Sequence, residues 1–260
     1  ELTAGNSNVA IGRAAGTLGD FSESVFVGAL AGYQNNQGAT VGIGNEALKN
    51  NTSVQNTAVG HRALITNTSG DSNTGLGFRV LDTNVTANNN TGIGSEALRN
   101  ATGGSNTAVG ASAGLNITGG TSNSFFGVGA GKATTSGSNN VAIGLSAMFS
   151  QTTVSANIAI GRNALYANIT GGNNTAIGDQ ALTSCTGSNN TAVGLYASLN
   201  TTSGGSNTSM GVQALQTNQT GEHNTAVGMY SLYANTGSKN TALGFEAGKS
   251  NNTAAENVFL

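Results

Sequence analysis

The sequence predicts an all-β protein, a parallel β-solenoid of about fifteen coils with 16–17 residues in each coil. A glycine recurs at intervals of 16 or 17 residues, and residues 1–260 therefore form a single repeat domain. Short β-branched runs precede each glycine, and the polar runs between repeats leave no room for a helix of about ten residues. Helical repeat families also need a longer period. The repeat glycines are Gly12, Gly28, Gly44, Gly60, Gly77, Gly94, Gly110, Gly127, Gly144, Gly161, Gly178, Gly194, Gly211, Gly228 and Gly244.

The composition narrows the class of protein. Only 8% of the residues are charged, against about 25% in typical globular domains, and the chain has 40 Gly, 36 Asn and no Pro. The net charge of -2 argues against nucleic acid or an anionic membrane surface as a partner. No apolar run approaches the length of a membrane span. Disorder is the alternative for such a polar chain, but the regular recurrence of Val, Ile and Leu favours an ordered repeat.

The first element of each coil is a short strand that ends at the repeat glycine. Positions are counted from that glycine, negative before it and positive after it. Position −3 is mostly β-branched and position −1 is always apolar, so the pattern has the period of two that is typical of a strand. We expect position −1 to be buried in one column. Members of that column include Ile93, Val109, Ile143, Ile160 and Ile177.

The second element follows the glycine, which we expect to turn the corner between two strands. Position +3 is Ala in thirteen coils, and position +4 is Leu in eight and Gly in five. The consensus is Asn-Thr-Ala-Val-Gly-x-x-Ala-Leu followed by a polar stretch, which predicts two short strands and two turns per coil. Successive coils then stack at about 4.8 Å.

Two asparagine columns mark the turns. Position −4 is Asn in thirteen of fifteen coils, with Ser24 and Thr40 as the exceptions. Stacked in register, these side-chain amides can form a ladder that satisfies backbone groups of the turn. A second column at position +6 or +7 predicts the other turn, because Asn tolerates left-handed backbone conformations. Its members are Asn50, Asn67, Asn84, Asn100, Asn116, Asn168, Asn200, Asn218, Asn235 and Asn251.

Position −2 suggests self-association. By strand alternation it should point out of the coil, yet it is small in most coils, as in Ala108, Ala142 and Ala159. A small outward column indicates a close neighbour, most simply further copies of the chain in a parallel homotrimer. The alternative is that small residues merely suit a tight strand. On the trimer hypothesis, aromatic residues would be wedges at the symmetry axis. These residues are Phe26, Phe125 and Phe259.

The repeat resembles known fibre proteins. Asn-Thr-Ala-Val-Gly at residues 56–60, 106–110 and 224–228 resembles the head repeats of trimeric autotransporter adhesins, and residues 140–144 come close to their Asn-Ser-Val-Ala-Ile-Gly motif. The array is also similar to phage tail-fibre-like proteins with Asn-Thr-Ala-Val-Gly repeats. The resemblance covers residues 6–260 and implies a left-handed β-roll in a homotrimer, with no catalytic machinery in the repeats. The coil is longer than in the adhesins, which implies larger turns.

Few residues offer reactive chemistry. His61 and His223 are ten coils apart, and Cys185 has no nearby histidine to act as a base. Metal-binding clusters of Cys and His are absent from the sequence. We therefore predict no catalytic, cofactor-binding or metal-binding residues. The charged residues are instead expected to form ion pairs between adjacent coils. These pairs are Glu46 with Arg62, Arg79 with Glu96, and Arg162 with Asp179.

Numerous Asn-x-Ser/Thr sequons allow two interpretations. They are glycan acceptors if the protein is secreted by a eukaryote, or else a consequence of turn chemistry in a chain rich in Asn and Thr. Turn chemistry is the interpretation that we favour. The sequons on the second Asn turn are at Asn50, Asn67, Asn84, Asn100, Asn116, Asn168, Asn200 and Asn218.

We expect a non-enzymatic, structural or adhesive segment of an extracellular homotrimeric fibre, on a cell or virion surface. Its partners would be other copies of itself, with surface glycans or a host-cell receptor as further candidates. The alternatives are a glycan- or ice-binding solenoid and a phage polysaccharide depolymerase. Ice binding requires an exposed threonine face, whereas strand alternation is expected to place the Thr column inside. The pattern begins again at Asn257 and reaches Leu260 before its glycine, and we therefore expect a segment of a longer protein.

Overall fold

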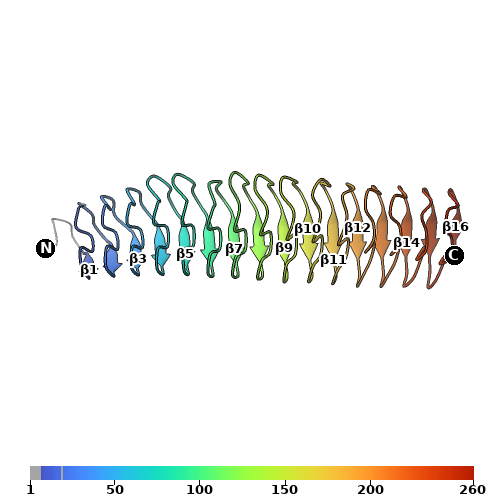
Figure 1. Ribbon diagram of the computed structural model, residues 1–260, viewed down its shortest axis with the longest axis horizontal. Coiled ribbons are helices and arrows are strands. Elements are labelled where there is room, and N and C mark those ends of the chain that lie inside the picture. The colour runs from blue at the N-terminus through green and yellow to red at the C-terminus, as the bar shows by residue number, and fades with distance from the viewer. Residues whose placement is uncertain (1–6, 19) are drawn as a thin grey trace. The chain divides into compact units, whose positions relative to one another are not determined.

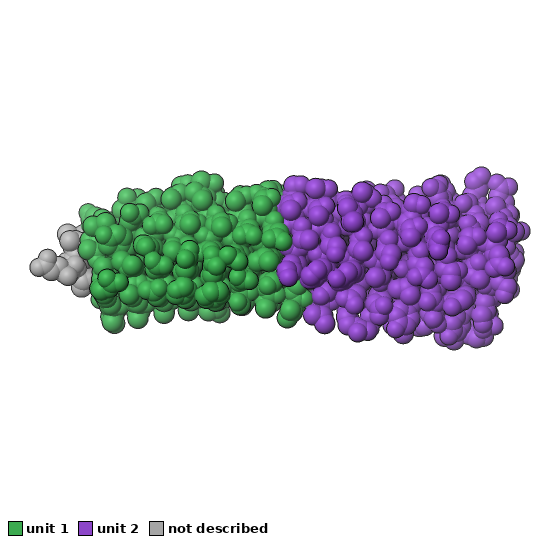
Figure 2. Space-filling model, in the orientation of Figure 1, with its two compact units in different colours: residues 1–129 green, residues 130–260 purple. Residues whose placement is uncertain are grey.

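The computed structural model describes residues 7–18 and 20–260, and within them the fold is all β, a parallel β-solenoid without helices. Residues 1–6 and 19 of the expected repeat domain lie outside the described part. The chain comprises two compact units, Glu1–Gly129 and Ala130–Leu260 (Figure 2). Within each unit the coils follow one another in chain order, with one strand per coil (Figure 1). The predicted fold class is confirmed.

The first unit holds eight strands that pair in parallel, each with the next along the chain. Residues at the same repeat position face each other across every pair, as in Val25↔Val41 and Ile43↔Val59. This register is the one that the repeat predicts. The strands are β1 (Val9–Ile11), β2 (Val25–Val27), β3 (Val41–Ile43), β4 (Thr57–Val59), β5 (Thr74–Leu76), β6 (Thr91–Ile93), β7 (Thr107–Val109) and β8 (Ser124–Phe126).

The second unit repeats this arrangement with eight more strands. Ile160 pairs with Ile177, and Val193 pairs with Met210, so position −1 again stacks on position −1. The incomplete last repeat also forms a strand, which pairs with its neighbour through Thr241↔Val258. The strands are β9 (Val141–Ile143), β10 (Ile158–Ile160), β11 (Thr175–Ile177), β12 (Thr191–Val193), β13 (Thr208–Met210), β14 (Thr225–Val227), β15 (Thr241–Leu243) and β16 (Val258–Phe259).

The expected second strand of each coil is a run of turns instead. Positions +2 and +4 have left-handed backbone conformations, as in Glu46 with φ 58° and Leu48 with φ 51°. Such residues cannot belong to an extended strand. Their backbone groups still bond between coils, because the Leu48 N–H donates to the Ala63 carbonyl at 3.0 Å. Backbone hydrogen bonds therefore link this segment to the neighbouring coils, as they would in a sheet, although its backbone is not extended.

The inside and outside of the strand are opposite to the expectation. The small residues at position −2, such as Ala108, Ala142 and Ala159, are fully buried. The apolar residues at position −1 face outward, with Ile143 40% exposed and Ile177 36% exposed. The column of Ile93, Val109, Ile143, Ile160 and Ile177 is thus exposed or half-buried rather than internal. The residues at −2 are small because the interior is narrow, and the inference of a close neighbouring chain from this column was wrong.

Position +4 supplies the large side chains of the core. They lie opposite position −2, since a Cβ atom added at Gly32 (+4) would stand 2.4 Å from the ring of Phe26 (−2). The strand and the turn segment are therefore the two facing walls of a thin interior. The leucines at position +4 have no exposed surface, and they are Leu48, Leu64, Leu81, Leu98, Leu165, Leu182, Leu215 and Leu232.

Departures from the consensus compensate one another in this interior. Phe26 is fully buried where Gly32 and Gly42 leave room, and a Cβ atom at Gly42 would lie 2.9 Å from its ring. Val80 replaces the usual Ala at +3 and occupies the space beside Gly75 and Gly92 at −2. Phe125, which was also expected to lie at the symmetry axis, is fully buried in its own chain.

The third expected wedge, Phe259, likewise packs against the chain's own core, next to Gly248. These three aromatic residues fill space inside the coils, and their expected place at a symmetry axis was wrong. Large and small residues occur together because the thin core is closely packed. Extra side-chain volume at one position must be offset by a smaller residue at a neighbouring position.

The repeat glycine is required by its conformation and by its neighbour. Gly60 has φ 135°, and an added Cβ atom would lie 2.2 Å from the Gly77 carbonyl oxygen of the next coil. No L-amino acid side chain fits such a site without moving the backbone. The glycine thus fixes both the corner and the distance between coils.

The predicted asparagine ladder at position −4 is confirmed. The Asn174 side-chain oxygen accepts the backbone N–H of Asn190 at 2.9 Å, and the Asn190 oxygen accepts that of Asn207 at 2.9 Å. Most of these amides also donate to a turn carbonyl, as Asn190 does to Gly204 at 3.0 Å, whereas Asn90 Nδ2 has no partner. At Ser24 the hydroxyl takes over, since the Thr40 N–H donates to Ser24 Oγ at 3.2 Å, and Thr40 Oγ1 lies 3.1 Å from Ser24 Oγ.

The second asparagine column divides into two. Residues at position +7, such as Asn67 and Asn84, are buried, and the Asn84 amide donates to the Asn67 oxygen at 3.0 Å. Residues at +6, such as Asn50 and Asn200, lie at the surface or are half-buried. Only position +7 is an internal ladder, so the expectation of one turn column holds for part of the set.

The compensation between Phe26 and Gly32 predicts a specific double-mutant cycle. Gly32→Leu restores the consensus residue but overlaps the Phe26 ring, and we expect a loss of about 2–3 kcal/mol of stability from overpacking. Phe26→Ala leaves a cavity and should cost about 3–5 kcal/mol. The double variant should be more stable than the sum of these losses predicts, because the new Leu fills the cavity. Denaturation followed by circular dichroism measures the coupling, and strictly additive losses would contradict this core.

Candidate functional site

The structure does not gather the predicted reactive residues into one site. His61 belongs to the first unit and stacks on Phe78, with ring centroids 5.6 Å apart. His223 belongs to the second unit, where its Nδ1 lies 4.0 Å from a Glu222 carboxylate oxygen. Among the described residues, no group of three or more His, Cys, Asp and Glu side chains is placed to hold a metal ion.

Cys185 occupies position +7, in the internal column that Asn fills in other coils. The thiol is fully buried, its Sγ lies 3.4 Å from the Gly187 carbonyl oxygen, and the Asn190 amide donates to Sγ at 3.4 Å. Burial raises the pKa of the Cys185 thiol to about 11, more than these hydrogen bonds lower it. The thiol therefore replaces one amide of the ladder, and at neutral pH it is protonated and unreactive.

One of the three expected ion pairs between coils is present. Arg162 Nη2 lies 2.8 Å from Asp179 Oδ2, and this pairing raises the pKa of the Arg162 guanidinium. Glu46 pairs with Lys49 of its own coil at 2.8 Å, and Glu96 pairs with Arg99 at 2.9 Å. The direct pairs between Glu46 and Arg62 and between Arg79 and Glu96 were wrong, because positions +2 and +5 of one coil lie side by side across the turn.

Asp82 is the charged residue that sequence reasoning missed. Its side chain is only 5% exposed, and it takes two hydrogen bonds from Arg79, at 3.0 and 2.7 Å. Arg62 and Arg99 of the flanking coils approach the same carboxylate to 3.5 and 3.9 Å. Three guanidinium groups from successive coils thus surround one buried carboxylate. Reading positions +2 and +5 together would have found this cluster in the sequence.

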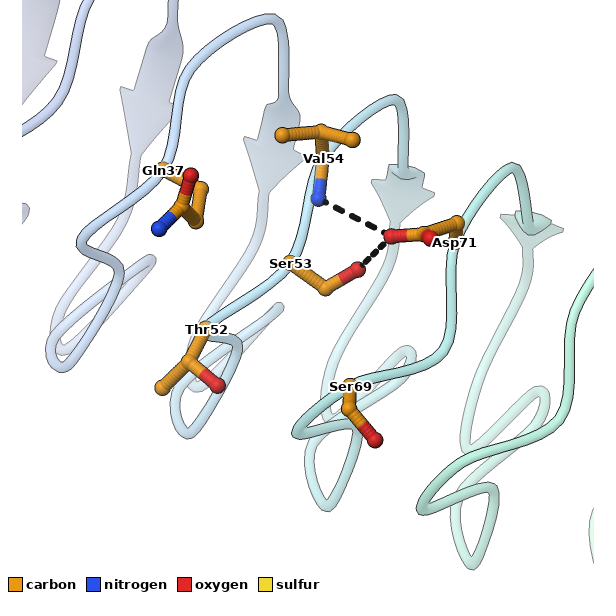
Figure 3. Close-up of a pocket in the computed structure, with 6 residues that line it drawn as sticks. All are labelled: Gln37, Thr52, Ser53, Val54, Ser69 and Asp71. Atoms are coloured by element: carbon orange, nitrogen blue, oxygen red, sulfur yellow. Dashed lines mark hydrogen bonds between the residues drawn. The ribbon is translucent and has the colours of Figure 1, made fainter.

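A shallow depression of about 230 Å³ lies on the polar turn of the first unit (Figure 3). Asp71 points at Ser53, and one carboxylate oxygen accepts both the Ser53 hydroxyl and the Val54 N–H (Figure 3). The other lining residues are Gln37, Thr52 and Ser69, so no imidazole, thiol or amine is present to activate the hydroxyl. The Ser53–Asp71 contact holds two coils together and does not resemble a nucleophile with its base.

Burial separates the sequons into two groups. The acceptor amides of Asn67, Asn84, Asn168 and Asn218 are fully buried in the +7 column. A glycan on these residues is incompatible with the fold. Asn200 is exposed, and Asn50, Asn100 and Asn116 are half-buried.

Large apolar side chains form a stripe on the outer face of the strands. Twenty of the twenty-three exposed large apolar residues of the described chain lie at positions −3, −1 and +1, and we call them the apolar stripe. In the first unit they are Val9, Ile11, Ile43, Leu76, Phe78, Ile93, Phe126 and Val128. In the second unit they are Ile143, Leu145, Ile158, Ile177, Leu195, Met210, Val212, Met229, Leu243, Phe245, Val258 and Leu260. Soluble monomers rarely expose contiguous apolar surface on this scale.

The threonines at position −3 lie on the same outer face. They are exposed or half-buried, so the expectation that they point inward was wrong. None of their hydroxyls hydrogen-bonds to another group in the described part of the chain. By contrast, most threonine hydroxyls at position +8 bond to carbonyls of the next coil, as Thr186 does to Thr202 at 3.1 Å. The unbonded column comprises Thr57, Thr74, Thr91, Thr107, Thr175, Thr191, Thr208, Thr225 and Thr241.

The outward positions +2 and +5 vary most in chemistry. All five tyrosines of the chain occupy them, namely Tyr33, Tyr166, Tyr196, Tyr230 and Tyr233. In the first unit the same positions hold the charged cluster around Asp82. In the second unit Phe149 and Tyr166 stack with centroids 5.3 Å apart, and Lys132 Nζ lies 5.3 Å from the Phe149 centroid.

Comparison of the chain with protein-family models, curated protein sequences and solved structures gives no match. Within residues 7–18 and 20–260 no helix is long and apolar enough to cross a membrane. The site assignments therefore rest on the geometry of the repeat itself.

The environment of Cys185 predicts that its thiol does not react in the folded protein. In the folded chain we expect negligible reaction with a disulfide reagent such as DTNB at pH 8, because the thiol is buried and its pKa of about 11 leaves little thiolate. Denaturant should expose one thiol per chain, which serves as the internal control. Rapid labelling of the native protein would contradict the placement of Cys185 in the internal ladder.

Proposed function

We propose that the protein is a structural and adhesive segment of an extracellular fibre, in which copies of the chain associate in parallel as a homotrimer. The observation that carries this proposal is the apolar stripe. Its side chains are stacked in register on an outward face, where water contact is unfavourable by about 25 cal/mol per Å² of apolar surface. Burial against further copies of the chain removes that cost. The number three rests on the resemblance to trimeric fibre repeats.

The surface on which we base self-association differs from the one that the sequence suggested. The small column at −2 is internal, so it contributes nothing to contacts between chains. The stripe replaces it, and parallel chains would place equivalent coils at equal height. A regular column of apolar groups on each copy is suited to such an interface, because every coil makes the same contact.

A lattice-binding role is the second candidate, and the threonine column favours it. Its hydroxyls lie without partners beside apolar side chains on a parallel sheet, with strands about 4.8 Å apart. Such a face suits ice binding, provided that no other chain covers it. Thermal hysteresis of a monomeric protein would support this role over the fibre.

Depolymerase activity has less support. Glycoside hydrolysis requires one carboxyl that is protonated near neutral pH, so its pKa must be raised. The Lys49 hydrogen bond lowers the pKa of Glu46, which is the wrong direction for a general acid. Asp82, Glu96 and Asp179 each lie within 3 Å of an arginine nitrogen. We therefore propose a non-enzymatic role.

Charge placed in the stripe should abolish self-association without unfolding the coils. We expect the parent chain to have three times the mass of one chain by light scattering. The double variant Ile143→Lys/Ile177→Lys should be monomeric at the same concentration, because assembly would bury several unpaired ammonium groups. Circular dichroism should still show a folded β protein, since both side chains point away from the core.

Ile169→Lys is the matched control. Ile169 is 51% exposed but lies at position +8, outside the stripe, so this variant should keep the parent mass. A monomeric parent chain would overturn the fibre proposal. So would a double variant that assembles as the parent does.

A further inference from the structure

We propose that positions +2 and +5 of the second unit form a binding edge for a carbohydrate chain. The aromatic edge, as we call it, consists of Phe149, Tyr166, Tyr196, Tyr230 and Tyr233. This inference rests on the adhesive role proposed above and names the class of ligand and the residues that would bind it.

The fold does not require aromatic side chains at these positions. Other coils have Ser112 or Ser146 at +2 and Thr183 at +5, with the same backbone conformation where φ is positive. The rings of the aromatic edge are half-buried and contribute nothing to the thin core between positions −2 and +4. Their presence therefore needs an explanation other than folding.

The repeat imposes an unfavourable backbone conformation on the rings at position +2. Tyr196 and Tyr230 have φ 57° and 59°, a left-handed conformation that is unfavourable for a bulky residue. The buried leucines at +4 offset the same strain through core packing, whereas these tyrosines are partly in water. Glu46, Arg62 and Ser112 share this conformation at the same position, so it is a property of the repeat and the bulky rings only add to its cost.

The edge adjoins the apolar stripe along one border, where the ring centroids of Tyr230 at +2 and of the stripe residue Phe245 at +1 lie 6.4 Å apart. Positions −2 and +4 meet inside the coil, as the 2.4 Å approach of a Gly32 Cβ atom to the Phe26 ring demonstrates. The turn segment is therefore the wall opposite the strand. Self-association through the columns at −3 and −1 would leave the rings at +5, those of Phe149, Tyr166 and Tyr233, accessible.

The chemistry of the edge suits a sugar more than a protein partner. Amides lie between the aromatic coils, with Gln180 following Tyr166, and with Gln213 donating to Gln216 at 2.8 Å. Aromatic rings pack against the apolar C–H faces of sugars, and amides bond to the hydroxyls. The cation at one end of the edge is neutralised, because Lys249 pairs with Glu246 at 2.5 Å.

Spacing gives a second reason for a polymer. Neighbouring coils are about 4.8 Å apart, which is close to the length of one hexose unit in an extended chain. Tyr166 has Phe149 on one ring face, and the next coil has only the small Thr183 at position +5, with its hydroxyl turned to the Gln180 carbonyl at 2.8 Å. One face of Tyr166 is therefore open to a sugar ring. Repeated weak contacts of this kind add up along a polysaccharide.

The test uses the full 260-residue chain on an array of immobilised neutral and sialylated oligosaccharides, with mixed-linkage β-glucan and galactomannan as soluble polymers. We expect binding to at least one of these probes. Tyr166→Thr and Tyr196→Ser, which use residues found at the same positions of other coils, should each weaken that binding about tenfold. Both variants should melt within a few degrees of the parent, because they relieve strain or leave the core unchanged.

Tyr33→Thr is the matched control, since Tyr33 occupies position +5 in the first unit, outside the aromatic edge, and this variant should bind as the parent does. Absence of binding to every probe overturns the inference, as does binding that neither edge variant weakens. Capture of a protein ligand through the same tyrosines, without glycan binding, would also overturn it. Light scattering on the same samples separates the two proposals. A trimer that binds no probe refutes the carbohydrate edge alone, and a monomer that binds one refutes the assembly alone.

Discussion

The hydrogen bond from a coil's backbone N–H at position −4 to the side chain at position −4 of the preceding coil, an asparagine in most coils, fixes the structure of this protein. The oxygen of Asn174 accepts the N–H of Asn190, while the amide of Asn174 donates to a turn carbonyl at 2.9 Å. Both bonds are buried, so losing either leaves a polar group without water. Every coil must therefore keep one register with its neighbour. The glycine at the corner, the thin core and the outward columns all follow from that register.

Because the register is fixed, residues at the same repeat position stack on one another in a column. Features that depend on one such column alone can be predicted from the sequence. Period, strand position, parallel pairing and the −4 ladder depend on local chemistry that repeats fifteen times, so all of them follow from the aligned glycines. The Arg162–Asp179 pair follows from the same alignment, because both residues occupy position +1. The second strand could not be predicted, since left-handed conformations at Leu48 and Glu46 contradict the usual preferences of Leu and Glu.

The orientation of the strand could not be decided from hydrophobicity either. Val and Ile are ordinarily expected inside a protein. Here the space between the strand and the turn segment is narrow, and the Leu side chains at +4 fill most of it, so only a small residue such as Ala fits at −2. The coils that depart from the consensus show which positions face the core. Val80 occurs between Gly75 and Gly92, Phe26 occurs near Gly32 and Gly42, and buried Ser198 and Ser209 hydrogen-bond at 2.8 Å. Exceptions that compensate in neighbouring coils identify −2, +3 and +4 as mutual contacts, which the average pattern conceals.

Some positions of the repeat are constrained by folding, and others can vary without affecting the fold. Internal columns accept only compensated changes, and the corner accepts only glycine. Outward columns carry no such constraint, yet their residues are not random, because apolar side chains gather at −1 and +1 while all five tyrosines stand at +2 and +5. Chance and folding would distribute these residues over every exposed position, including the polar turn. Their segregation into separate sets of columns, which adjoin where Tyr230 contacts Phe245, supports two separate roles, assembly through the strand face and recognition through the turn face.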